Sequence, residues 1–128
     1  MVAVDTSVLV RILIDDEAQR GQVVKARSFA KKVGSVFVSQ IVQIELVWVL
    51  EAAYRFPHQQ VLSILEHLFE NSAFVLQNED EFSTGLKVFK TEHKDFSDCL
   101  IYAESLTKKC ELVTFDKKFS RLPCLKLL

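Results

Sequence analysis

Short apolar runs alternate along the chain with longer segments in which apolar residues recur every three or four positions. The short runs are rich in valine, leucine and phenylalanine and predict strands over residues 2–4, 35–39, 73–77, 111–115 and 124–128. The longer segments between them predict helices. Strands separated by helices are typical of parallel β-α-β connections. The pattern therefore predicts an α/β fold, a three-layer sandwich in which helices flank a central parallel sheet of four to five strands.

Capping residues mark where several predicted helices begin and end. Ser7 and Ser39 each precede an apolar helical segment, and we expect each to cap it. Residues 15–34 begin with acids and end with lysines and Gly34, an order that suits the helix dipole and a glycine after the last turn. Pro57 is expected in the first turn of the next helix. Further helices are expected over residues 58–71, 78–93 and 95–109.

The composition indicates a single globular domain over residues 1–128. The formal net charge is -1, so no overall basic signal points to nucleic acid, although a local patch can still bind it. The 3 cysteines lack a C-x-x-C spacing and lie beside apolar residues, so we expect buried, reduced thiols in a cytoplasmic protein. The N-terminus lacks the basic stretch of a secretion signal, and the longest apolar run, residues 46–50, is too short to span a membrane.

Four acids are expected near one edge of the predicted sheet. Asp5 follows the first strand and Asp116 follows the fourth, while Glu45 and Asp98 lie in helices whose first residues are near the same edge. In an open parallel sheet, ligands bind at the carboxyl ends of the strands. Carboxylates gathered there would repel one another and raise one another's pKa, and a divalent cation removes that conflict. Oxygen ligands alone favour Mg²⁺ or Mn²⁺ over zinc, and a phosphodiester is then the natural substrate.

Each of three aspartates also has a purely structural interpretation. Asp5 can be a helix cap or a turn residue. Asp98 can complement the dipole of its helix, with Asp95 as the cap three residues earlier. Asp116 can be a turn residue before two solvated lysines. These structural roles do not require the acids to lie near one another, whereas a metal site requires them to lie close together.

Glu45 is harder to explain as an ordinary surface residue. The residues around it are apolar: Ile41, Ile44, Leu46, Val47, Trp48 and Val49. An ionised glutamate in such surroundings is costly unless it is paired or bound to a cation. An ion pair with Arg11 is the simplest structural alternative.

Four motifs occur in a characteristic order: VAVDTSVL at 2–9, SQIVQIEL at 39–46, DFSDCLIYA at 95–103 and LVTFDKKF at 112–119. Together they resemble the motifs of the PIN domain, most closely those of the VapC-type toxins of prokaryotic toxin–antitoxin modules. The resemblance spans essentially the whole chain. It is the ordered set on an alternating α/β pattern, rather than any one motif, that makes it specific.

The resemblance implies an endoribonuclease that needs Mg²⁺ or Mn²⁺ and cuts single-stranded or looped RNA. It carries over four residues as catalytic and metal-binding acids: Asp5, Glu45, Asp98 and Asp116. Thr114 would hold a water or phosphate, Ser7 or Thr6 would play a similar part, and Asp95 is either an accessory acid or a cap. The resemblance also implies a homodimer and a cognate antitoxin protein, whose arginine would reach the acids as a charge-assisted plug.

A few basic residues lie near the acids in the sequence. The expected, weak contacts to RNA are Arg11, Lys94, Lys117 and Lys118, although lysines after a turn are usually solvated. Three phenylalanines are expected in the core rather than as base-stacking platforms: Phe96, Phe115 and Phe119. Trp48 is expected in the core or in a dimer contact. No catalytic role is assigned to the histidines, His58, His67 and His93.

Other classes of protein fit the sequence less well. A receiver domain needs a phospho-acceptor aspartate after a central strand, and residues 73–77 end without one. A haloacid-dehalogenase-like phosphatase needs a second aspartate at the position of Ser7. A PIN-like scaffold that binds RNA or protein without cutting remains the alternative, although the presence of all four acids argues against it.

Overall fold

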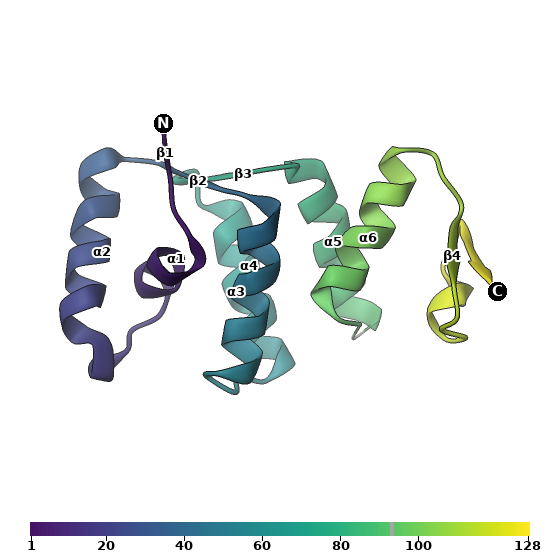
Figure 1. Ribbon diagram of the computed structural model, residues 1–128, viewed down its shortest axis with the longest axis horizontal. Coiled ribbons are helices and arrows are strands. Elements are labelled where there is room, and N and C mark those ends of the chain that lie inside the picture. Colours follow the sequence, from purple (N-terminus) through teal and green to yellow (C-terminus); the bar gives the residue numbers. More distant parts are fainter. Residues whose placement is uncertain (93) are drawn as a thin grey trace. The chain divides into compact units, whose positions relative to one another are not determined.

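The computed structural model describes residues 1–92 and 94–128 (Figure 1). His93, to which the sequence assigns no catalytic role, lies outside the described residues. The chain divides into two compact units, Met1–Asn78 and Glu79–Leu128. The first, unit 1, carries Asp5 and Glu45, and the second, unit 2, carries Asp98 and Asp116.

Unit 1 contains a parallel three-stranded sheet in the order β1-β2-β3. Its strands are β1 (Val2–Ala3), β2 (Val36–Val38) and β3 (Phe74–Leu76). Ala3 aligns with Phe37, which aligns with Val75, so the three carboxyl ends lie at one edge of the sheet. At that edge the chain passes from β1 through Val4 to Asp5, and from β2 to the helix that carries Glu45.

The helices of unit 1 follow the predicted pattern closely. They are α1 (Thr6–Leu13), η1 (Glu17–Gln19), α2 (Arg20–Val33), α3 (Gln40–Ala52) and α4 (His58–Glu70). Gly34 ends α2 with φ 84°, and the Ser39 hydroxyl accepts the Val42 N–H at 3.3 Å, as predicted. Pro57 precedes α4 as its N-cap rather than lying in its first turn. Helix α1 packs against α2 and α3, and α3 packs against α4, around fully buried leucines such as Leu46.

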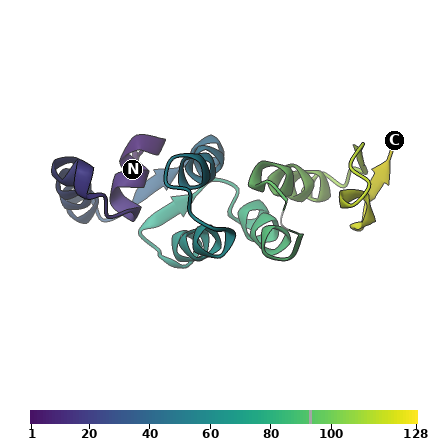
Figure 2. The same ribbon diagram turned by 90° about the horizontal axis from the view of Figure 1, so that it is seen from below.

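Unit 2 begins with two helices, α5 (Glu79–Glu92) and α6 (Phe96–Thr107). They are followed by β4 (Leu112–Thr114), η2 (Phe119–Arg121) and β5 (Leu125–Leu127). Helices α5 and α6 lie side by side in both views (Figures 1 and 2). The ring of Phe96 meets those of Phe82 and Phe89 edge to face, each at 5.5 Å. Strands β4 and β5 pair in parallel. This packing fixes the first turn of α6, which carries Asp98.

The α/β class with parallel strands is confirmed, and every predicted strand is present within one or two residues of its predicted ends. The strands pair as a three-stranded and a two-stranded sheet. One central sheet in a single domain stays a prediction. Cys99 is buried as predicted, but Cys110 and Cys124 are exposed, so that prediction is wrong for them. Among the described residues, no helix is both long enough and apolar enough to cross a membrane.

Candidate functional site

Asp5 is the N-cap of α1, in extended backbone conformation. Its Oδ1 accepts the Val8 N–H at 3.0 Å and the Ser7 hydroxyl at 2.8 Å. The capping role predicted for Ser7 is therefore wrong, because Ser7 instead donates to the cap. The Val8 N–H, and then the Ser7 hydroxyl, lower the pKa of Asp5 below its ordinary 3.8, not above it as crowding alone would. Asp5 is thus ionised at neutral pH.

Glu45 is connected to the beginning of α1 through Thr6. The Thr6 hydroxyl donates a hydrogen bond of 3.0 Å to Glu45 Oε1. The side chain of Glu45 is exposed, so the expected burial among apolar neighbours is wrong. Since Thr6 follows Asp5 directly, this contact places the two unit 1 acids on neighbouring elements at the carboxyl edge of the sheet.

Arg11 does not neutralise Glu45, contrary to the structural alternative. Its Nη1 lies 3.8 Å from Asp16 Oδ2 and donates to the Tyr54 hydroxyl at 3.0 Å. Its Nε donates to the Gln22 side chain at 2.9 Å. Tyr54 in turn donates to Asp16 at 2.8 Å. Arg11 therefore joins α1 to the segments that follow it. The hydrogen bond to the Glu45 carboxylate comes from Thr6 and not from Arg11.

A set of amide side chains fixes α3, the helix of Glu45, to the edge of the sheet. Gln43 is fully buried, and its Nε2 donates to the carbonyl oxygens of Gln77 at 3.0 Å and Val38 at 3.3 Å. The Gln77 side chain accepts the Gln40 N–H at 2.8 Å. Sequence reasoning missed these positioning residues. The signal was available, since Gln43 is a polar residue in the most apolar helical segment of the chain.

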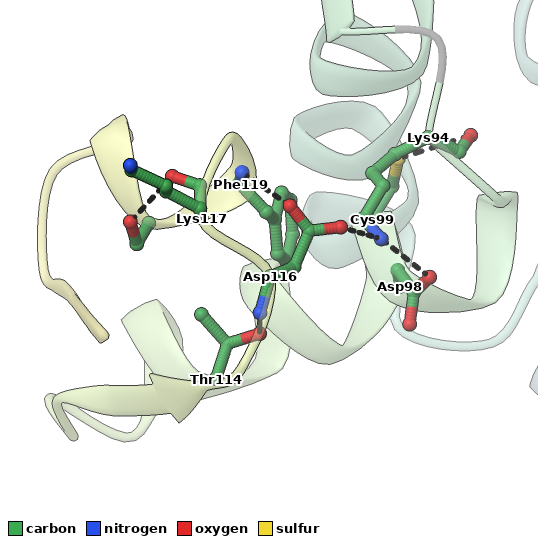
Figure 3. A network of polar contacts seen from close by, with 8 residues as sticks. Lys94, Asp98, Cys99, Thr114, Asp116, Lys117 and Phe119 are labelled. Atoms are coloured by element: carbon green, nitrogen blue, oxygen red, sulfur yellow. Dashed lines mark hydrogen bonds and ion pairs between the residues drawn. The ribbon is translucent and has the colours of Figure 1, made fainter. Parts of the chain in front are cut away.

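In unit 2, a lysine joins the two predicted acids (Figure 3). Lys94 Nζ lies 2.7 Å from Asp116 Oδ2 and 3.5 Å from Asp98 Oδ2. The same ammonium lies 5.1 Å from the centroid of the Phe119 ring. Asp98 and Asp116 come from different elements, the first turn of α6 and the turn after β4. The structure therefore brings these two acids together around one cation of the protein itself.

The turn after β4 holds Asp116 through three further hydrogen bonds. Its Oδ1 accepts the Phe119 N–H at 2.8 Å, its own N–H donates to Thr114 Oγ1 at 3.0 Å, and its carbonyl accepts the Ser120 N–H at 3.0 Å. The Lys94 ammonium, and then the Phe119 N–H, lower the pKa of Asp116 below its ordinary 3.8. Asp116 raises the pKa of Lys94 above its ordinary 10.5 in return. Thr114 thus orients the acid, and its predicted contact with water or phosphate stays a prediction.

The other predicted residues of unit 2 lie as follows. Asp95 occupies the N-cap position of α6, where its carbonyl accepts the Cys99 N–H, but its side chain makes no capping hydrogen bond within the described chain. Lys117 and Lys118 are exposed, as is usual for lysines after a turn. Among the aromatic side chains, Phe96 and Phe119 are buried as predicted. Phe115 and Trp48 are exposed, so neither of them lies in the core.

A groove of about 700 Å³ runs beside Asp5 within unit 1. Its lining includes Ser7 and Arg11 from α1 and Lys25 and Phe29 from α2. Sequence reasoning missed Lys25, although Gln22, Lys25 and Phe29 recur at the spacing of one helix face. The groove offers a cationic and an aromatic side chain next to a predicted metal-binding acid.

The four predicted acids thus form two pairs in the structure, one in each unit. Within the described residues of either unit, no group of three His, Cys, Asp or Glu side chains is arranged to hold a metal ion. The donors that are present, carboxylates and hydroxyls fixed by hydrogen bonds, are of the kind that binds Mg²⁺ or Mn²⁺. A common site for all four acids stays a prediction.

Comparison with known proteins agrees with the order of the motifs. The family model of the PIN domain matches residues 2–124. The chain is also similar to a VapC ribonuclease of Aquifex aeolicus (strain VF5), with 26% identity over 125 residues. That alignment covers 95% of this chain and 92% of the relative. Both matched regions are long enough to include the acids of unit 1 and of unit 2.

Proposed function

Because the chain belongs to the PIN-domain family, we propose that it is a Mg²⁺- or Mn²⁺-dependent endoribonuclease, and the toxin of a type II toxin–antitoxin pair. The observation that carries the proposal is the placement of the acids. Asp5 comes two residues after the end of β1 and Asp116 two residues after the end of β4, and each is fixed by hydrogen bonds that favour its ionised form. Rigid, ionised oxygens at strand ends are what a hard divalent cation requires.

The four acids share one part in the proposed reaction, and the hydroxyls beside them have another. Asp5, Glu45, Asp98 and Asp116 would hold the metal, with Thr6 fixing Glu45 and Thr114 orienting Asp116. When bound, the divalent cation would activate a water and stabilise negative charge on the phosphodiester. Ser7 and Asp95 are accessory groups, Ser7 because it holds Asp5 Oδ1 and Asp95 because it lies one turn before Asp98.

RNA would be held by side chains around the acids. The groove beside Asp5 offers Arg11 and Lys25 to phosphates and Phe29 to a base. The exposed Lys117 and Lys118 extend the basic surface after Asp116. Such local cations suffice although the formal net charge of the chain is -1.

The proposed toxin role is supported by the similarity of the chain to a protein named a VapC ribonuclease. The proposal includes a cytoplasmic homodimer and an antitoxin protein whose arginine pairs with the acids. An exposed helix face of α3 with Ile41 and Trp48, which are 72% and 58% exposed, supports an interface with a protein partner.

The test is cleavage of a structured RNA by the purified chain, freed of any partner, with Mg²⁺, with Mn²⁺ or with EDTA. We expect metal-dependent cleavage that EDTA abolishes and that Asp5→Asn reduces at least 100-fold. Asp80→Asn is the matched control, because Asp80 is an exposed acid of α5 outside the predicted site. Equal activity of wild type and Asp5→Asn would refute the nuclease proposal.

A PIN-like scaffold that binds without cutting is the alternative from another class. It predicts that RNA or a protein partner binds equally well with and without EDTA and that no cleavage occurs in any metal. The nuclease proposal predicts cleavage together with a fall in RNA affinity when the metal is removed.

A further inference from the structure

Lys94 occupies a specific position between two acids. Its ammonium is 2.7 Å from Asp116 Oδ2, 3.5 Å from Asp98 Oδ2 and 5.1 Å from the centroid of the Phe119 ring (Figure 3). The side chain is 28% exposed, less than either acid at 36% and 37%. An ammonium held by two carboxylates and an aromatic face is more tightly defined than a typical surface lysine.

The position of Lys94 in the sequence makes this arrangement informative. Lys94 lies just before α6, where the partial positive charge of the helix N-terminus disfavours a cation. The pair Lys94–Asp98 also has the less favourable order, with the cation N-terminal to the acid. Local helix electrostatics therefore does not explain why Lys94 points to this place, whereas the long-range partner Asp116 does.

We propose that Lys94 is a built-in counter-ion of Asp98 and Asp116, which holds both carboxylates in place without a metal and weakens divalent-cation binding to them. The inference rests on the proposed metal-dependent function and adds a residue that sets metal affinity. With Lys94 present, the trio carries a net charge of -1, and without it the two acids carry -2. An incoming cation must displace the ammonium or share the carboxylates with it, and either costs affinity.

The experiment measures Mn²⁺ binding to the purified full chain by calorimetry, together with thermal unfolding in EDTA. Lys94→Met removes the charge and keeps most of the stem. We expect its Mn²⁺ dissociation constant to be about tenfold lower than that of wild type, because the acids lose their competing cation. We also expect a lower midpoint of thermal unfolding in EDTA, with the loss recovered at saturating Mn²⁺.

Two control variants separate the counter-ion from other effects of charge. Lys94→Arg keeps a cation at the site and should retain the wild-type affinity for Mn²⁺. Lys117→Met removes an equal charge next to Asp116, but Figure 3 shows its side chain directed away from that acid. Its affinity for Mn²⁺ should stay within about twofold of wild type. Lys94→Gln gives the same comparison with a polar side chain if Lys94→Met does not fold, as checked by circular dichroism.

The outcomes distinguish this inference from the proposed function. If wild type binds Mn²⁺ and Lys94→Met and Lys94→Gln bind it equally or more weakly, the counter-ion inference is overturned while the metal site stands. If Lys94→Arg binds as tightly as Lys94→Met, charge is not the cause and the inference is again overturned. If no variant binds Mn²⁺, the proposed metal site fails, and the inference fails with it.

Discussion

The hydroxyl of Thr6 donates a 3.0 Å hydrogen bond to Oε1 of Glu45, although 39 positions separate the two residues in the sequence. Thr6 is the first residue of α1, and Glu45 lies in the middle of α3. An exposed glutamate side chain is otherwise free to occupy many rotamers. The bond therefore selects one direction for the Glu45 carboxylate and relates it to the cap residue Asp5.

Replacing Thr6 with valine tests the value of this contact. Valine keeps the shape of threonine but has no hydroxyl, so Glu45 loses its fixed direction. A hydrogen bond to a charged group is worth about 1.5 kcal/mol, so we expect RNA cleavage, measured as kcat/KM, to fall about tenfold. Thr6→Ser, which keeps the donor, should stay near wild type. Equal values for Thr6→Val and Thr6→Ser would show that the hydroxyl is dispensable.

Two substitutions of Asp5 separate its structural role from its chemical one. Asp5→Asn keeps an oxygen that can accept the Val8 N–H, so the free energy of unfolding should change by less than about 1 kcal/mol. Asp5→Ala removes the cap and should cost about 1–2 kcal/mol. Both should lose metal-dependent cleavage, since both lose the charge. Chemical denaturation and an RNA cleavage assay measure the two effects on the same samples, and an active Asp5→Asn would assign Asp5 to capping alone.

The Lys94–Asp116 ion pair predicts a defined dependence of stability on pH. The pKa of Asp116 is lowered in the folded protein. The ion pair therefore stabilises the fold fully at pH values above the ordinary aspartate pKa of 3.8, and this stabilisation is lost as the pH falls through the lowered pKa. The pKa of Lys94 is raised, so its contribution is complete below its ordinary 10.5 and is lost as the pH rises through the raised value. The stability difference between wild type and Asp116→Asn, from urea titrations at several pH values, should therefore be largest between these limits. A difference that does not change with pH would contradict this account.

Helices α5 and α6 make a close approach at Gly85. A Cβ at this position would lie 2.9 Å from Leu100 Cδ2 and 3.5 Å from backbone atoms of Cys99. Gly85→Ala gains helix propensity and needs only the end of a flexible leucine to move, so we expect a change within about 1 kcal/mol. Gly85→Val adds methyl groups against the backbone of α6 and should destabilise the fold by about 1–3 kcal/mol. Equal stability of the two variants by thermal unfolding would argue that the helices separate easily here.

The elements of the fold were predictable because their signals are local. The Ser39 cap, the glycine after α2 and the five apolar runs all depend on a few consecutive residues. The exposure of Glu45 was not predictable in the same way. Its neighbours in the sequence are apolar, but the residues that share its face of α3, Ile41 and Trp48, are themselves exposed. Which face of an apolar helix is buried depends on the elements that pack against it.

The contacts of the acids show the same limit. The Lys94–Asp98 pair could be read from its spacing of four residues, but the shorter contact of Lys94 with Asp116 spans 22 residues and depends on the turn after β4. The ion pair with Arg11, which was the structural alternative for Glu45, also depended on packing, because Arg11 contacts Asp16 and Tyr54 instead. Residue types and their order therefore led to the prediction of the four acids, whereas tertiary packing determines the partners of each acid.

The Val8 N–H and the Ser7 hydroxyl both donate to the same oxygen of Asp5, Oδ1. An ion bound at the proposed site would compete with these two donors for Oδ1, which disfavours bidentate coordination by Asp5. Calcium favours many oxygens and frequently takes both from one carboxylate, whereas magnesium needs fewer protein ligands and keeps its waters. In the proposed site, the hydrogen bonds that cap α1 would therefore favour magnesium over calcium.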